Sequence, residues 1–176
     1  MTALNDVHVL LVDDNDQMRL LLRCLLRAGG FSNISEAETV ARAFEVMREH
    51  PVDLVIVDWI MQPVDGLSFT RRMRWDSASP DPYMPILMLT AHTEASRVAA
   101  ARDAGVTGFI KKPISTRLLF DRVASALTDT RMFIRSDDYC GPDRRRGAVA
   151  GYAGPFRRAS DQPNLDTVDV DDLRVA

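Results

Sequence analysis

The chain has 176 residues, which is enough for one domain and an appendage. Its apolar content of 46% and charged content of 27% are ordinary for a soluble globular protein, and a net charge of −3 excludes the strong basic field typical of nucleic-acid binding. No apolar run approaches the roughly 20 residues that cross a membrane, and the N-terminus lacks the regions of a signal peptide, so we expect a cytoplasmic protein without a membrane partner.

Short apolar runs alternate with amphipathic stretches over the first 128 residues. The apolar runs predict strands at 7–12, 31–37, 54–58, 86–89 and 106–110. The stretches that follow them predict helices at about 16–28, 39–50, 67–75, 94–104 and 116–127. Strands that alternate with helices in this way imply a parallel sheet with right-handed crossovers and helices on both faces.

The first predicted helix has clear ends and an amphipathic pattern. Asn15 or Asp16 can cap its N-terminus, and Gly29-Gly30 ends it. Apolar residues recur at helical spacing and predict a core-facing side, formed by Met18, Leu21, Leu22 and Leu25. The arginines fall on the other side and predict a solvent-exposed face, formed by Arg19, Arg23 and Arg27.

The run at 54–58 leads from four apolar residues into Asp58, which predicts a strand that is buried on both faces and ends in an acid. Taken alone, Asp58 is equally well interpreted as a helix-capping or turn residue. Other polar residues also follow predicted strands, and the carboxyl ends of parallel strands meet at one edge, where open α/β sheets bind ligands. The residues expected to converge there are Asp13, Asp14, Asp58, Thr90 and Lys112.

The residue types in this set suit phosphoryl transfer. Three carboxylates close together repel one another, and a bound cation relieves the repulsion. Oxygen ligands favour a hard ion such as Mg²⁺, which binds carboxylates, water and phosphate oxygens. The lysine supplies a compact positive charge and the threonine a hydroxyl donor, so the set predicts a site that forms an aspartyl phosphate.

From about residue 6 to 128, the chain resembles the receiver domain of bacterial two-component response regulators of the chemotaxis-regulator type. The resemblance rests on Asp13-Asp14, on Asp58 before a tryptophan, and on Asp65-Gly66, Thr90-Ala91 and Lys112-Pro113. It implies a flavodoxin-like (βα)5 fold, which is a doubly wound parallel sheet in the order 2-1-3-4-5. It also implies a signalling protein switched by phosphorylation and not an enzyme.

The resemblance implies a role for each residue of the set. Asp58 would accept a phosphoryl group from a histidine kinase or a histidine phosphotransfer protein. Lys112 would pair with Asp58 and then with the phosphoryl group, to which Thr90 would also bond. The Mg²⁺ would be held by the carboxylates of Asp13, Asp14 and Asp58 and by the backbone carbonyl of Ile60.

Three neighbouring residues are interpreted through the same resemblance. The Lys112-Pro113 peptide is expected to be cis, a conformation that is cheap only before proline. Phe109 matches an aromatic position that swings inward as Thr90 moves, although a buried strand residue is the plainer interpretation. Lys111 is interpreted as a surface charge.

The chain departs from the family pattern near Asp58. The proline that usually follows Met61 directly comes one place later, as Gln62-Pro63, which leaves the path of this loop open. Ile60 and His92 stand at the two positions that shape water access to the phosphoryl group. We predict that apolar Ile60 slows attack by water and lengthens the phosphorylated lifetime, and we interpret His92 as a solvated loop residue.

After Leu127 the composition changes, which divides the chain into a receiver domain at 1–130 and an irregular, extended or partly disordered arm at 131–176. A motif occurs twice in the arm, as Tyr139-Cys-Gly-Pro-Asp-Arg-Arg and as Tyr152-Ala-Gly-Pro-Phe-Arg-Arg. The Gly-Pro-Asp-Arg-Arg part resembles the tails of receiver-only proteins. The net charge is +4 over 131–158, with seven arginines and three aspartates, and −4 over 159–176.

Three interpretations of the arm remain open. Its polar composition is typical of a disordered tail. Alternatively, it docks on its own or a partner receiver, with Tyr and Gly-Pro in turns, arginines paired with acids, and a short strand at 131–135. In the third interpretation Arg144-Arg145-Arg146 contacts nucleic acid, which the acidic terminus disfavours.

Two other functions compete with that of a phosphorylated regulator. An aspartyl phosphatase would carry a second aspartate two residues after the first, where this chain has Ile60. A degenerate receiver would bind partners without phosphorylation, which the intact acidic set disfavours. A downstream protein is the other expected partner, a homodimer is left open, and Cys24 and Cys140 are expected to be free thiols.

Overall fold

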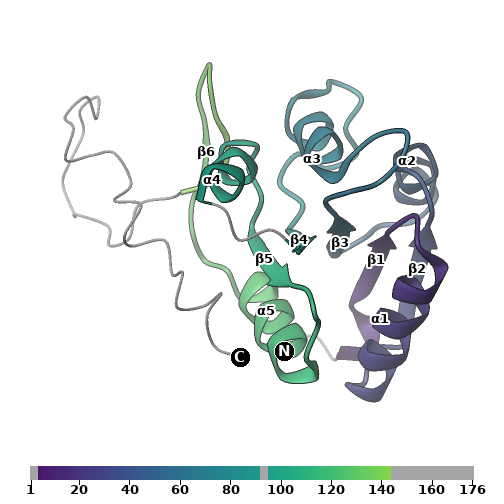
Figure 1. Cartoon of the computed structure of the whole chain (residues 1–176). Helices are drawn as coiled ribbons and strands as arrows, with labels where there is room; N and C mark the ends of the chain where they lie inside the picture. The colour runs from purple at the N-terminus through teal and green to yellow at the C-terminus, as the bar shows by residue number, and fades with distance from the viewer. Residues whose placement is uncertain (1–3, 92–94, 144–176) are drawn as a thin grey trace.

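The computed structural model describes residues 4–91 and 95–143 of the chain. Its centre is a parallel sheet with the strand order β2-β1-β3-β4-β5, which confirms the predicted flavodoxin-like fold (Figure 1). The strands are β1 (His8–Val12), β2 (Asn33–Ala37), β3 (Leu54–Asp58), β4 (Ile86–Thr90) and β5 (Gly108–Lys111). A short 3-10 helix, Leu4–Asp6, precedes β1.

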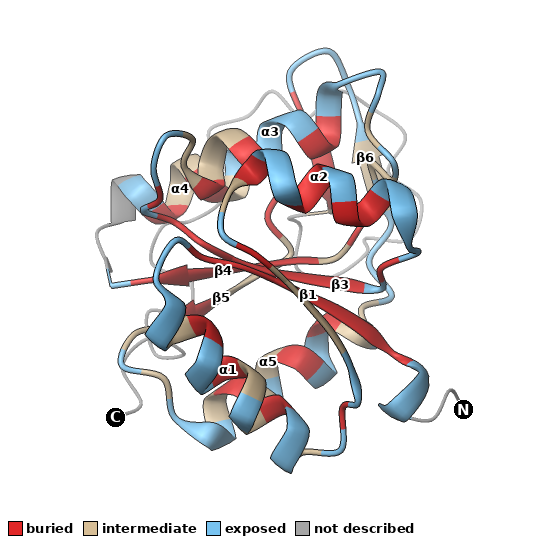
Figure 2. Ribbon diagram, turned by 90° about the vertical axis from the view of Figure 1, so that its right-hand side faces the viewer, coloured by how far each residue is buried: buried red, intermediate tan, exposed pale blue. Residues whose placement is uncertain are grey.

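Helices cover both faces of this sheet. In the described residues they are α1 (Asp16–Ala28), α2 (Val40–Glu49), α3 (Gly66–Trp75), α4 (Ala95–Asp103) and α5 (Thr116–Leu127). Figure 2 shows α2, α3 and α4 on one face and α1 and α5 on the other, with their buried residues turned toward the sheet. Among the described helices, none combines the length and the apolar character needed to span a membrane.

Each face of the sheet has its own apolar core, because successive residues of a strand point to opposite sides. The core on the α2 side includes Leu10, Phe44, Val55, Val57, Phe69 and Met88. The core on the α1 side includes Val9, Leu11, Leu22, Ile56, Leu89 and Leu119. Strands β1, β3 and β4 are buried along their whole length, as uninterrupted apolar runs predict for a sheet covered on both faces.

The helix ends follow capping residues that are visible in the sequence. Before α1, the side chain of Asn15, and not that of Asp16, accepts hydrogen bonds from the first turn. The same role falls to Thr39, Asp65 and Ser115 before α2, α3 and α5. Gly30 and Gly105 have φ values of 93° and 92°, a left-handed conformation that glycine adopts without strain.

The predicted faces of α1 are wrong at two positions. Arg19, expected in solvent, is buried, because its guanidinium donates to the backbone oxygen of Asp13 at 2.6 Å and to the carboxylate of Glu36. Leu21, expected in the core, is 44% exposed. The buried residues of α1 are Arg19, Leu22 and Leu26.

Several predicted boundaries shift by a few residues. The second strand begins at Asn33 instead of Phe31, and the fifth covers 108–111 instead of 106–110. In both places the chain first completes a turn at a left-handed glycine, Gly30 or Gly105. The expected start of the fourth helix, together with His92, lies at 92–94 and so falls outside the described residues.

The described part of the arm forms a hairpin of antiparallel strands (Figure 1), β6 (Phe133–Arg135) and β7 (Cys140–Pro142). Strand β7 contacts α3. Over 131–143 the arm therefore docks on its own receiver, and Arg131 pairs with Asp129, in agreement with the docking interpretation. The expected strand at 131–135 covers only 133–135, and Gly141-Pro142, expected in a turn, lies in β7. Residues 144–176, with the second motif and Arg144-Arg145-Arg146, lie outside the described residues. The division of the chain at residue 130 stays a prediction.

Candidate functional site

The carboxyl ends of the strands bring polar residues to one edge of the sheet. Asp58 is the last residue of β3, Thr90 is the last residue of β4, and Asp13 follows β1 directly. All three are almost fully buried, with exposed fractions of 6% for Asp58, 1% for Thr90 and 1% for Asp13. Buried polar side chains need partners, either within the protein or in a bound ligand.

Lys112 reaches the same edge from the end of β5. Its Nζ lies 2.7 Å from Asp58 Oδ1 and 3.8 Å from Asp13 Oδ2. Its backbone N–H donates to the carbonyl oxygen of Thr90 at 2.8 Å, which holds Lys112 beside the end of β4. The Lys112–Pro113 peptide is cis, as expected. The fold thus brings an acid pair and an ammonium group together, with Thr90 at the end of the neighbouring strand.

Asp13 is a buried carboxylate with one oxygen that lacks a hydrogen-bond partner in the described residues. Its Oδ1 accepts a hydrogen bond of 2.8 Å from the backbone N–H of Asn15, but Oδ2 has no hydrogen-bond partner within the described residues. Burial raises the pKa of the Asp13 carboxyl; the Asn15 bond opposes the rise, the charge of Asp58 adds to it, and Lys112 opposes it. A bound cation at Oδ2 would stabilise this group.

Arg19 supports the site in a way that the sequence analysis missed. Its guanidinium donates to the backbone oxygen of Asp13 at 2.6 Å and thereby fixes the turn that follows β1. Three arginines at helical spacing look alike in the sequence, so no signal separated Arg19 from the exposed Arg27.

Asp14 lies at the rim of the site. The residue is exposed, and its Oδ2 accepts a hydrogen bond of 3.0 Å from the backbone N–H of Gln62. The Gln62–Pro63 peptide, which holds the displaced proline, is cis. The loop between β3 and α3 therefore lies against Asp14.

Helix α3 begins directly against the end of β3. The backbone N–H of Gly66 donates to the carbonyl oxygen of Trp59 at 3.0 Å, and a Cβ at Gly66 would overlap the backbone oxygen of Asp58. Asp65 caps the helix by accepting a hydrogen bond of 2.7 Å from the N–H of Ser68. The Asp65-Gly66 pair thus positions Asp58 and leaves the chemistry to other residues.

The acids at this edge fit a hard divalent cation by their chemistry. The unpartnered Asp13 Oδ2 beside Asp58 offers the carboxylate oxygens that Mg²⁺ prefers, and Asp14 stands next in the chain. The side chain of Ile60 is 57% exposed and offers no ligand atom, so only its backbone carbonyl suits the predicted role. Within residues 4–91 and 95–143, no three His, Cys, Asp or Glu side chains already form a metal-binding group.

Phe109 lies within β5, where it is paired with Met88 of β4. The residue is half-buried and packs against the core on the α2 side. Its ring therefore packs against the core while part of its surface stays in solvent. An inward movement of the ring would bury this remaining surface.

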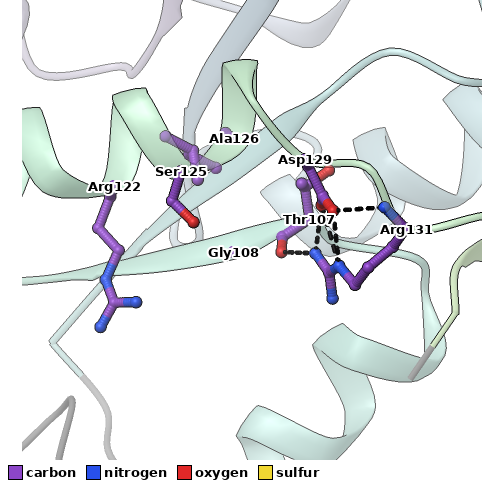
Figure 3. Close-up of a pocket in the computed structure, with 8 residues that line it drawn as sticks. Thr107, Gly108, Arg122, Ser125, Ala126, Asp129 and Arg131 are labelled. Atoms are coloured by element: carbon purple, nitrogen blue, oxygen red, sulfur yellow. Dashed lines mark hydrogen bonds and ion pairs between the residues drawn. The ribbon is translucent and has the colours of Figure 1, made fainter. Parts of the chain in front are cut away.

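A cavity of about 270 Å³ lies away from these residues, near the amino end of β5 (Figure 3). Thr107 and Gly108 line it on the strand side, and Arg122 lines it from α5. Arg131 donates to Asp129 and to the backbone oxygen of Thr107 across one wall, as the dashed lines in Figure 3 show. The start of the arm therefore lines one wall of this cavity, which shares no lining residue with the acids at the other edge.

Comparison with known proteins gives a consistent result for the receiver part of the chain. The family described as response regulator receiver domain matches residues 9–124. The chemotaxis protein CheY of Pseudomonas aeruginosa is 31% identical over 117 residues, which cover 66% of this chain and 93% of that protein. The chemotaxis protein CheY-3 of Vibrio cholerae is 31% identical over 118 residues, which cover 67% of this chain and 89% of that protein.

Solved structures show the same likeness in three dimensions. The chemotaxis protein CheY4 of Vibrio cholerae superposes with a TM-score of 0.63 at 26% identity, covering 69% of this chain and 98% of that one. The family match ends at residue 124, so the arm and its repeated motif lie beyond it.

Proposed function

The chain belongs to the response regulator receiver family, and we propose that Asp58 is the aspartate on which it is phosphorylated. The proposed donor is a histidine kinase or a histidine phosphotransfer protein in the cytoplasm, and the proposed cofactor is Mg²⁺, which receiver domains generally bind at their acidic site. The proposed output is a changed surface for a downstream protein.

The contact between Lys112 and Asp58 is the observation that supports this proposal most. The ammonium group of Lys112 lies 2.7 Å from the Asp58 carboxylate at a buried sheet edge, so it can pair with the negative charge that a phosphoryl group would add there. The competing interpretation of Asp58 as a helix cap loses support, because Asp65 caps α3. Asp58 instead ends β3 at the sheet edge where open α/β folds bind ligands, which supports its proposed role as the nucleophile.

In the proposed transfer, a carboxylate oxygen of Asp58 attacks the phosphorus of a phosphohistidine. The new P–O bond forms as the P–N bond breaks, and the electron pair of that bond returns to the imidazole nitrogen. The product is an acyl phosphate on Asp58. Its new negative charge faces Lys112 Nζ, and the Thr90 hydroxyl donates to one phosphoryl oxygen.

The cation's contribution is electrostatic. The carboxylates of Asp13, Asp14 and Asp58 and the backbone carbonyl of Ile60 would hold Mg²⁺, which would supply positive charge beside the transferring group. The unpartnered Asp13 Oδ2 supports this assignment, because it is a buried oxygen that lacks a donor within the described residues.

The proposed switch runs through Thr90 and Phe109. Thr90 ends β4, and Phe109 lies on the neighbouring strand with part of its surface exposed. A movement of Thr90 toward the phosphoryl group would leave space into which the aromatic ring can move. We propose that this rearrangement regulates binding of a target protein, and that the chain catalyses nothing beyond its own phosphorylation and dephosphorylation.

Phosphorylation by a small donor such as acetyl phosphate tests the proposal. Intact-mass analysis should show one added phosphoryl group in the presence of Mg²⁺, and little or none when the metal is chelated. The Asp58→Asn variant should stay unmodified, and Lys112→Met should be modified more slowly because the ammonium group is gone. Asp121→Asn removes an exposed carboxylate on α5 and should behave as wild type.

Two results would overturn the assignment. Equal modification of wild type and Asp58→Asn would place the phosphoryl group elsewhere. A wild-type chain that takes up no phosphoryl group with Mg²⁺ present would favour the alternative of a degenerate receiver that binds partners without phosphorylation.

A further inference from the structure

The hairpin of the arm docks on a surface built from three separate segments of the receiver. We call this surface the tail receptacle; it consists of Arg74 in α3, Tyr83 in the loop before β4, and Gly105 after α4. The ring of Phe133 in β6 packs edge-on against Tyr83, with 5.1 Å between ring centroids. The backbone of Cys140 in β7 lies against Gly105. A Cβ added to Gly105 would overlap the carbonyl oxygen of Cys140.

Arg74 holds the receptacle together. It is fully buried, and its guanidinium donates to the backbone oxygens of Pro82, Met84 and Gly105 at 2.8–3.1 Å. Burial lowers the pKa of Arg74 to about 10, which still leaves it charged at neutral pH. Its guanidinium carbon lies 5.0 Å from the centroid of the Phe133 ring, a cation–π contact with the arm.

The first Tyr-x-Gly-Pro segment is the part of the arm that fits this surface most closely. All four of its residues are buried, and Cys140 is 0% exposed. The hydroxyl of Tyr139 donates to the backbone oxygen of Pro142 at 2.6 Å and closes the segment on itself. A Cβ at Gly141 would lie 2.6 Å from Gly105 Cα, so the position requires glycine.

The same pattern recurs thirteen residues later as Tyr152-Ala-Gly-Pro. It keeps the tyrosine, the glycine and the proline, and it places Ala153, which is smaller than cysteine, at the position that is fully buried in the first segment. We propose that the tail receptacle is a binding site for Tyr-x-Gly-Pro segments, and that the second segment of the same molecule is its alternative ligand. The two segments exclude one another, because both need the contact with Gly105.

The chain length permits this exchange and sets its direction. In the docked hairpin, the four residues 136–139 join β6 to β7. With the second segment in place of β7, the loop would contain the 17 residues 136–152, and the loop-closure cost would favour the first segment by roughly tenfold. The first segment is therefore the resident ligand. The second outcompetes any segment from another copy, because the chain that precedes it tethers it to the same molecule.

Thiol reactivity tests the exchange in the full-length chain. Both natural cysteines are free, as expected, with Cys24 exposed and Cys140 buried. In a chain that carries Cys24→Ser and Cys140→Ala, Ala153→Cys places a single thiol in the second segment. The rate at which iodoacetamide alkylates this thiol is measured by mass spectrometry. It is compared between the chain with an intact first segment and the chain that also carries Tyr139→Ala and Gly141→Ala. These two substitutions remove the hydrogen bond from Tyr139 to Pro142 and the required glycine, and so disable the first segment.

We expect alkylation to slow by about fivefold or more when the first segment is disabled, because the second segment then fills the receptacle. Adding Gly154→Ala should restore fast alkylation. In the matched control, Ala148→Cys replaces Ala153→Cys and places the single thiol outside the motif. This thiol should be alkylated at the same rate whether the first segment is intact, disabled, or disabled together with Gly154→Ala.

Equal alkylation rates with the first segment intact and disabled would overturn the proposal. Protection that survives Gly154→Ala would also overturn it, because the receptacle requires glycine. Protection that disappears on dilution of the protein would show that a second copy supplies the ligand, and this would overturn the assignment to the same molecule.

Discussion

Asp13 is a carboxylate that costs the protein stability and therefore suits a cation. Its Oδ2 is buried without a hydrogen-bond partner in the described part of the chain, and such a group costs about 1–3 kcal/mol. We predict that, without Mg²⁺ at neutral pH, Asp13→Asn raises the free energy of unfolding in urea by about 1 kcal/mol, the lower end of that range. Excess Mg²⁺ should reverse the order, because the wild type gains more from binding.

The pH dependence of this difference has a definite sign. The folded-state pKa of Asp13 lies above the ordinary value of 3.8, so the folded protein binds this proton more tightly than the unfolded chain does. The difference in free energy of unfolding between Asp13→Asn and the wild type should be largest at neutral pH. It should shrink as the pH falls through the raised pKa of Asp13, because the wild-type carboxyl then becomes protonated and uncharged. Asp6→Asn, at an exposed carboxylate, should show no gap, and a metal-free wild type more stable than Asp13→Asn would contradict the argument.

Ile60 gives a second prediction at the residue scale. Its side chain is 57% exposed beside the phosphorylation site, so Ile60→Asn should change stability by less than about 0.5 kcal/mol. An amide can hydrogen-bond an attacking water where the apolar side chain cannot, so we expect the variant to lose its phosphoryl group severalfold faster. The rate is measured by mass after the donor is removed, with exposed Leu20→Asn in α1 as control. An unchanged or slower rate in Ile60→Asn would reject the prediction.

For single residues, the sequence predicted which polar groups meet but not how each one is held. Asp58 and Thr90 end their strands and Lys112 directly follows β5, and the topology alone brings strand ends to one edge. The bond from Gln62 to Asp14 depends on the path of a loop, and loops lack the periodic pattern from which a path could be inferred.

At the scale of elements, the junction between β3 and α3 decides where Asp58 points. Gly66 begins α3, where alanine would ordinarily favour the helix by at most about 1 kcal/mol. A Cβ there would overlap the backbone oxygen of Asp58, however, and relieving such an overlap costs about 1–3 kcal/mol. We predict that Gly66→Ala lowers the free energy of unfolding and also slows phosphorylation, because the end of β3 must shift.

Urea denaturation and the phosphorylation assay check this prediction together. Gly108→Ala is the matched control, since its Cβ would approach only the flexible end of the Leu87 side chain, at 3.0 Å. A Gly66→Ala chain as stable as wild type, or one that is destabilised but phosphorylated at the normal rate, would show that the junction does not position Asp58.

The elements themselves were largely predictable, because their signals are local. Buried runs at β1, β3 and β4 and capping residues such as Asn15 and Ser115 act over a few positions. The errors arose where tertiary contacts decide the outcome. Arg19 turns inward because Asp13 and Glu36 lie there, and the helical pattern of α1 carries no trace of those partners.

For the whole molecule, the parallel sheet with two cores follows from alternating strands and helices, but the docking of the arm does not. Its receptacle is formed by Arg74, Tyr83 and Gly105, which lie in three segments that no sequence pattern connects. The family match, which stops at residue 124, offers no precedent for it either. The sequence left a disordered tail, a docked arm and a nucleic-acid contact open, and the structure of the first motif copy shows a docked segment over 131–143.

The most direct test of the central claim is the position of the phosphoryl group in the chain. Borohydride reduces an acyl phosphate to the alcohol and so leaves homoserine where an aspartate was phosphorylated. After treatment with acetyl phosphate and Mg²⁺, peptide mass spectrometry should find homoserine at position 58 and at no other aspartate. Homoserine at a different position, or none in a chain that has gained a phosphoryl group, would contradict the account.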